Sequence, residues 1–340
     1  MWNQKILGHE KILRHFEILI KKNNFPHACV LVGPDDIGKF RISREIAKFL
    51  QCENNFCGYC DICKKISKNI FPEVLTIGKL WKSGKEENFS EICKTSNFDQ
   101  SHRQKNNVKN DQIGIEDVKK ILDFFSTTGN AKAKIAIIKN AERMTNEAAN
   151  SILKILEEPP KNGKIILTSK NKNLLLQTII SRVKIFNFSL ISEKKLEEFL
   201  INKKQQISDE QKRDFLLLSQ GRSEYLFRLL ENPDFFEFEK EQFHNFSSFF
   251  QNWSFSEKID RAEKISAPEN FKKLEHFLEN FLRFMRSILL EKISAKNFPI
   301  AQKISFNKII NILEKIKKTQ YFLKKNINRR ILLENLFFEI

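Results

Sequence analysis

The chain has 340 residues, of which 41% are hydrophobic and 30% charged, and its formal net charge is +17. This mixture is typical of a globular protein with two or three domains and excludes a wholly disordered chain. No run approaches the roughly 18 apolar residues of a transmembrane helix, and residues 1–10 show no apolar signal-peptide core. We therefore expect a cytoplasmic protein with no membrane partner.

The positive charge has two explanations, and the sequence leaves both open. One is a surface that meets phosphate groups, which places nucleic acid first among the partners. The other is composition, because Lys, Asn, Ile and Phe are all abundant, as an AT-rich genome would produce.

The first half of the chain alternates helical and strand-like patterns. The expected helices span residues 4–22, 40–50, 115–125 and 146–156, and the expected strands span residues 28–32, 134–139, 164–169 and 183–188. Strands that alternate with helices predict a parallel sheet flanked by helices. We therefore expect an α/β domain over residues 1–190.

The second half is almost wholly helical by pattern. Gly221 and Pro233 indicate a break within it near residue 235. We expect a helical lid over residues 191–235 and an all-α domain over residues 236–340. A polar segment without periodicity, residues 79–110, is predicted to be an insertion in the α/β domain.

The segment Gly33–Lys39 reads GPDDIGK and fits the phosphate-loop pattern G-x-x-x-x-G-K between a strand and a helix. Gly33, Gly38 and Lys39 are the candidate phosphate-binding residues. The next position, where a hydroxyl normally binds Mg²⁺, is Phe40, which offers no ligand atom. A chance match on an unrelated fold is the alternative.

Hydrolysis of a nucleotide also needs an acidic group at the end of a neighbouring strand. The expected strand over residues 134–139 runs instead into Lys139 and Asn140. We therefore predict a phosphate-loop fold that does not hydrolyse ATP, and the sequence leaves open whether ATP binds.

Four cysteines, Cys52, Cys57, Cys60 and Cys63, lie within twelve residues. Paired thiolates at x₂ spacing suit tetrahedral Zn²⁺, and a site filled by four cysteines is structural rather than catalytic. An iron–sulfur cluster and unligated thiols are the alternatives. Cys29 falls in an expected buried strand and is predicted to be a core residue.

Several segments occur in an order that resembles the AAA+ clamp-loader subunits of bacterial DNA polymerase III, most closely the delta-prime branch. They are Ile6–Glu10, Pro26–Ala28, Gly33–Lys39, the cysteine cluster, Ala148–Pro160 (AANSILKILEEPP), Ser181-Arg182 and, near the C-terminus, Asn326–Leu336. The resemblance covers nearly the whole chain and is weakest between residues 235 and 320.

The resemblance implies an accessory subunit of the polymerase holoenzyme, in a hetero-oligomeric ring with gamma/tau and delta subunits. Such rings load a sliding clamp onto primed DNA. It also implies a subunit that does not hydrolyse ATP, in which Ser181 and Arg182 offer an arginine finger to a neighbour's ATP site. Arg222 would match a lid arginine that contacts nucleotide, and residues 236–340 a collar.

Three alternatives remain at this point. From the residues alone, an arginine at the entry to a strand is usually a surface or ion-pair residue, and this reading of Arg182 stays open. The chain as a whole is compatible with an ATP-hydrolysing gamma/tau-type subunit, although the hydroxyl at position 40 and the acids at 139 and 140 are missing. It is also compatible with a stand-alone nucleic-acid-binding phosphate-loop protein.

Overall fold

The computed structural model describes residues 6–54, 56–78, 112–127, 132–203, 207–252, 254–267, 271–294, 304–323, 325 and 327–339. The chain divides into two compact units, Met1–Gln205 with Gly221–Phe227, and Gln206–Gln220 with Arg228–Ile340. The predicted insertion over residues 79–110 and Cys93 lie outside the described residues. The division into α/β domain, lid and collar stays a prediction.

In the part of the first unit that the structure describes, five parallel strands form one sheet in the order β2-β3-β4-β1-β5. They are β1 (Ala28–Val32), β2 (Val74–Ile77), β3 (Lys134–Ile138), β4 (Gly163–Ser169) and β5 (Lys184–Asn187). The central strands are almost entirely buried, as the uninterrupted apolar runs of their sequences require in a sheet covered on both faces. The predicted parallel α/β fold is confirmed.

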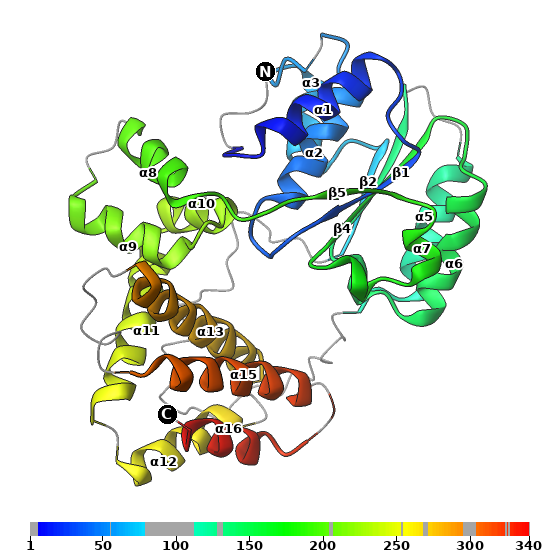
Figure 1. Ribbon diagram of the computed structural model, residues 1–340. Helices are drawn as coiled ribbons and strands as arrows, with labels where there is room; N and C mark the ends of the chain where they lie inside the picture. The colour runs from blue at the N-terminus through cyan, green and yellow to red at the C-terminus, as the bar shows by residue number, and fades with distance from the viewer. Residues whose placement is uncertain are drawn as a thin grey trace, which may run out of the picture. The chain divides into compact units, whose positions relative to one another are not determined.

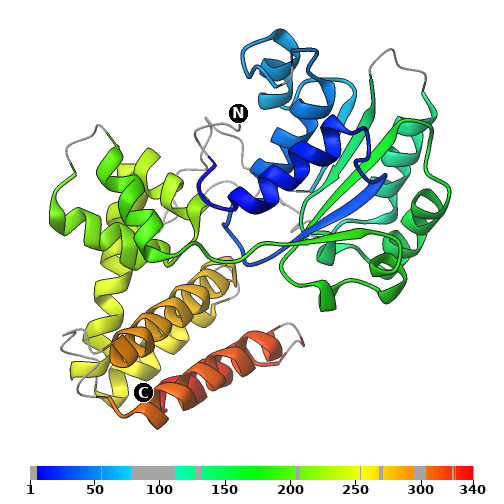
Figure 2. The ribbon, with the colours of Figure 1, turned by 45° about the horizontal axis from the view of Figure 1, so that its top comes forward.

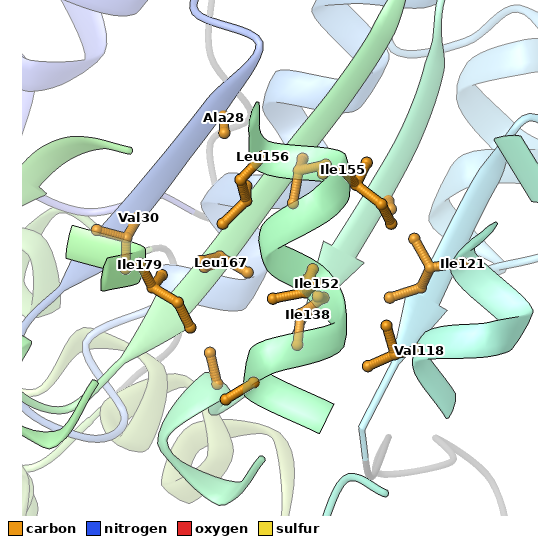
Figure 3. Packing of buried hydrophobic residues seen from close by; sticks show 14 of the residues in the cluster. Ala28, Val30, Val118, Ile121, Ile138, Ile152, Ile155, Leu156, Leu167 and Ile179 are labelled. Carbon is orange, nitrogen blue, oxygen red and sulfur yellow. The ribbon is translucent and has the colours of Figure 1, made fainter. Parts of the chain in front are cut away.

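Helices cover both faces of this sheet (Figures 1 and 2). One face carries α1 (Glu10–Lys21), α2 (Lys39–Gln51) and α3 (Asp61–Ser67), and the other carries α5 (Ile115–Ser126), α6 (Asn146–Glu157) and α7 (Gln177–Ile180). Two short 3₁₀ helices, η1 (Ala141–Arg143) and η2 (Lys172–Leu174), follow β3 and β4, and α8 (Glu193–Asn202) follows β5. Figure 3 shows the core on the second face, where Ile152 and Leu156 of α6 pack with Ile179 of α7.

The first helix starts later than its periodicity predicts. Gly8 and His9 both adopt left-handed backbone conformations, with φ of +76° and +63°, so a helix cannot pass through them. An added Cβ at Gly8 would also lie 2.8 Å from Cδ1 of Ile191, so the Ile191 side chain would have to shift. Helix α1 therefore begins at Glu10.

The described residues of the second unit are mainly helical. Its helices are α9 (Asp209–Ser219), the end of α10 (Ser223–Glu231), α11 (Pro233–Asn252), α12 (Phe255–Ser266), α13 (Phe271–Ser294), α15 (Phe306–Leu323) and α16 (Arg329–Phe337). The chain turns between α9 and α10, where Gln220 and Gly221 have φ of +47° and +85°. Near the predicted break, α10 ends at Glu231 and α11 begins at Pro233. The unit's own core is rich in Phe, Leu and Ile, including Leu278, Phe281 and Ile312. Among the described residues, no helix combines the length and the apolarity that crossing a membrane requires.

Candidate functional site

The candidate site is built at the carboxyl ends of the strands, where the loop after β1 leads into α2. The first residue of this loop, Gly33, must be glycine, because a Cβ there would collide with the backbone oxygen of Phe188. Gly38, the last residue before the helix, has a φ of +88°. The sequence therefore forms the tight strand–loop–helix connection that a phosphate loop needs.

Lys39, the lysine of the loop, folds back over the loop's own backbone. Its Nζ donates hydrogen bonds to the carbonyl oxygens of Gly33 and Pro34, both at 2.5 Å. Burial lowers the pKa of Lys39, while the carboxylates of Asp35 and Glu142 oppose that shift. The ammonium group thus satisfies the loop carbonyls and faces two carboxylates of the same unit.

Phe40 and Lys139, the two positions that depart from a hydrolysing site, contact each other. The Lys139 Nζ lies 5.4 Å from the centre of the Phe40 ring, and the Arg44 guanidinium carbon lies 5.2 Å from it. Both distances are typical of cation–π contacts. The place where a hydroxyl and an acid would bind Mg²⁺ therefore holds an apolar ring and two positive charges.

The neighbouring strand ends are fixed by polar contacts. The Asn140 N–H donates to Oγ1 of Thr168 at 2.9 Å, and the Lys170 Nζ pairs with Oδ2 of Asp35 at 2.5 Å. Glu142, which the sequence analysis did not single out, lies in η1, and no described residue donates a hydrogen bond to its two buried oxygens. No motif identifies this acid, because it follows the strand by four positions.

The start of α10 is attached to the same loop. The Asp36 carbonyl accepts hydrogen bonds from the backbone N–H groups of Glu224 and Tyr225, at 2.8 and 3.2 Å. The Arg41 guanidinium makes a two-point ion pair with Glu224, at 2.6 and 2.7 Å. Arg222 directly precedes this contact and is half-buried. Arg41 and Glu224 were missed because they are 183 positions apart in the sequence.

The four predicted zinc ligands lie together, from the end of α2 at Cys52 to the first turn of α3 at Cys63. Their sulfur atoms all lie within 4.8 Å of one another, and Cys52 Sγ is 3.7 Å from Cys57 Sγ and 3.9 Å from Cys60 Sγ. Four thiolates about 2.3 Å from a tetrahedral zinc ion would be about 3.8 Å apart. The geometry therefore fits a metal ion held by four cysteines.

Backbone N–H groups of the cysteine turn point at the sulfurs. Cys57 N–H donates to Cys52 Sγ at 3.4 Å, and Cys60 N–H donates to Cys57 Sγ at 3.3 Å. Burial tends to raise the pKa of the Cys57 thiol, but hydrogen bonds from Cys60 and Tyr59 outweigh it and lower the pKa to about 7. These donors stabilise the thiolate, the form that binds metal.

Cys29, the predicted core cysteine, is fully buried in β1, and this prediction is confirmed. Burial raises the pKa of its thiol to about 12, so Cys29 stays protonated.

Arg182 lies between α7 and β5 and is held by three acceptors. Its Nη2 pairs with Oε1 of Glu157 at 2.7 Å, and its Nη1 donates to the Thr178 carbonyl and to Ser181 Oγ at 3.0 and 3.1 Å. The two charged side chains are 35% and 50% exposed. The guanidinium is thus ion-paired within its own subunit but remains accessible to a partner.

Comparison with known proteins finds similar subunits of bacterial DNA polymerase III. A gamma subunit of DNA polymerase III from Buchnera aphidicola (Acyrthosiphon pisum) is 28% identical over 200 residues, covering 57% of this chain and 47% of its own length. A delta' subunit of DNA polymerase III from Bacillus subtilis is 26% identical over 206 residues, covering 59% of this chain and 53% of its own length. The chain therefore spans about half the length of these two relatives.

A solved structure of a DNA polymerase III gamma subunit-related protein from Thermotoga maritima aligns with 96% of this chain and 97% of its own. The TM-score is 0.45 and the identity 19%. The sequence pattern of the family described as "DNA polymerase III, delta subunit" matches residues 8–192. Because this match covers more than half of the chain, the protein belongs to the family of DNA polymerase III delta subunits.

Proposed function

We propose that the chain is the delta-prime-type subunit of a bacterial clamp loader, which binds gamma/tau and delta subunits but does not itself hydrolyse ATP. In this proposal the ring acts on a sliding clamp and primed DNA, and the protein works in the cytoplasm at the replisome. The contact between Phe40 and Lys139 carries the proposal. It supports a subunit that lacks both an oxygen ligand for Mg²⁺ and an acid to orient water.

This contact also bears on the gamma/tau-type alternative, which the identity to gamma subunits favours. A hydrolysing subunit must bring Mg²⁺ between the nucleotide phosphates and the loop. Two cations at an apolar ring oppose a divalent cation at the same place. We therefore infer that any nucleotide at Lys39 would have a structural role.

Arg182 is proposed as the residue that this subunit contributes to catalysis. Its ion pair with Glu157 is exposed to solvent, and such pairs contribute only about 0.2–1 kcal/mol to stability. A guanidinium at a subunit edge can stabilise the charge that develops on a transferred γ-phosphoryl group. The exposure of the Arg182 side chain therefore supports a role in contacting a partner subunit.

The four cysteines complete the proposal as a structural zinc module. Zinc bound to four thiolates has no open position for a substrate. The ion would hold the chain between α2 and α3 in one conformation.

The proposed function is tested with Arg182→Ala in the complex reconstituted with the motor subunits of the same organism. We expect the variant to assemble and to retain its metal, while DNA-stimulated ATP hydrolysis and clamp loading fall. An arginine finger raises the rate of phosphoryl transfer at its own site by about 10³–10⁵. The loss in total ATP turnover will be smaller, because the variant affects one site of the ring. Full clamp loading by the assembled variant would refute the arginine finger. Arg182→Lys should not rescue, because an ammonium lacks the planar fork that spans two oxygens.

A further inference from the structure

Glu157 stands at a position that helix stability does not explain. It is the last residue of α6 and is followed by a second acid, Glu158. The C-terminal end of a helix carries partial negative charge, so carboxylates are disfavoured there. A favourable contact outside the helix is therefore needed to explain a glutamate at this position.

That contact is Arg182. The Glu157 carboxylate approaches Nη2 of the guanidinium at 2.7 Å, while the Thr178 carbonyl and Ser181 hydroxyl hold Nη1. An arginine has five N–H donors, and these three contacts use three of them. Among the described residues, the Nε–H and the second Nη2–H have no acceptor. Nε and Nη2 form one edge of the planar guanidinium, and two-point binding of phosphate oxygens uses such an edge.

Both sides of the ion pair are attached to a rigid core. Leu156, next to Glu157 on α6, is 2% exposed, and Ile179 of α7 is fully buried (Figure 3). Helices α6 and α7 contact each other across this core. Pro159 and Pro160 then end the helix, which fixes where its last turn stops. The buried core thus holds the backbone from which the Glu157 carboxylate extends.

We propose that Glu157 is a positioning residue for Arg182, holding one edge of the guanidinium so that the Nε/Nη2 edge is presented to a partner's phosphate. This inference rests on the proposed role of Arg182 as an arginine finger. It assigns a function to the ILEEPP segment: Leu156 anchors the helix, Glu157 orients the finger and the prolines stop the helix.

The test is a double-mutant cycle in the reconstituted complex with Glu157→Gln, Arg182→Ala and the double variant. Glutamine keeps the size and removes the charge. We expect Glu157→Gln to cause at least half of the loss in DNA-stimulated ATP turnover that Arg182→Ala causes. The double variant should lose no more than Arg182→Ala alone, because Glu157 acts through Arg182. The loss should appear in the maximal rate and not in the ATP concentration for half-maximal rate.

Glu158→Gln is the matched control, because it makes the same charge change one residue away on an exposed side chain with no contact to Arg182. It should leave turnover unchanged. If Arg182→Ala lowers turnover and Glu157→Gln does not, the positioning role is wrong and the finger stands. If Arg182→Ala has no effect, the proposed function itself fails. Equal losses in Glu157→Gln and Glu158→Gln would show a general charge effect and overturn the inference.

Discussion

Removal of the metal from the cysteine cluster should unfold the zinc module, residues 52–63, and leave the parallel sheet folded. Ordering the twelve residues Cys52–Cys63 costs roughly 12–24 kcal/mol, at about 1–2 kcal/mol per residue. Phe56 is buried against Phe49, with ring centres 5.4 Å apart, and this burial stabilises the folded module by about 1.5–3 kcal/mol. Binding of a structural zinc ion contributes about 10–16 kcal/mol. Phe56 burial alone is far smaller than the entropy cost of ordering the module, and Phe56 burial together with zinc binding is comparable to it.

The assay is elemental analysis followed by limited trypsin digestion with and without a chelator. We expect about one zinc per chain, and chelation should open the bonds after Lys64 and Lys65 in α3. Replacing Cys63, which is fully buried, by Ser should have the same effect, while Cys93→Ser serves as the control and should retain the metal. A metal-free chain in which α3 stays protected would refute the reasoning, as would iron with a visible chromophore.

Three further predictions follow from particular contacts. The isolated chain should show no ATPase activity, and Phe40→Ser alone should not create it; turnover near 1 s⁻¹ in a preparation free of motor subunits would contradict this. In the second unit, the carboxylate of Glu239 is 3% exposed and bonded to His276 and Asn280 at 2.8 and 2.9 Å. Glu239→Ala should therefore lower the free energy of unfolding by about 2–4 kcal/mol in urea titrations, and a loss no larger than that of exposed Glu241→Ala would count against it. Burial lowers the pKa of His9, which means that the unfolded chain binds a proton near pH 6.5 and the folded chain only at lower pH. Stability should thus fall as the pH drops through this window, and His9→Asn, which tolerates the left-handed backbone, should flatten the fall in a series of melting temperatures.

The strands were predictable where burial is complete. β1 and β3 are apolar runs between clear boundaries, and the sequence places both within one residue. The sequence analysis missed β2, because it has only four residues, lies at the edge of the sheet and buries only its last residue. An edge strand of this kind lacks both the alternation and the long apolar run on which strand prediction depends.

The local parts of the site were also predictable. The glycines around Lys39 and the cysteine spacing require nearby residues only, and the structure brings each set together. The pair between Arg182 and Glu157 joins two elements whose proximity depends on the fold, so no spacing rule identifies it. One signal was available: an acid at a helix C-terminus opposes the helix dipole and implies a partner cation.

The central claim is tested most directly by reconstitution with the gamma/tau-type and delta subunits of the same organism. The measurement is clamp loading onto primed DNA by the complex with and without this chain. We predict that the chain co-purifies with the motor subunits in a fixed ratio and that loading depends on it. Full loading in its absence, or failure of the purified subunits to bind it, would contradict the assignment as a clamp-loader subunit.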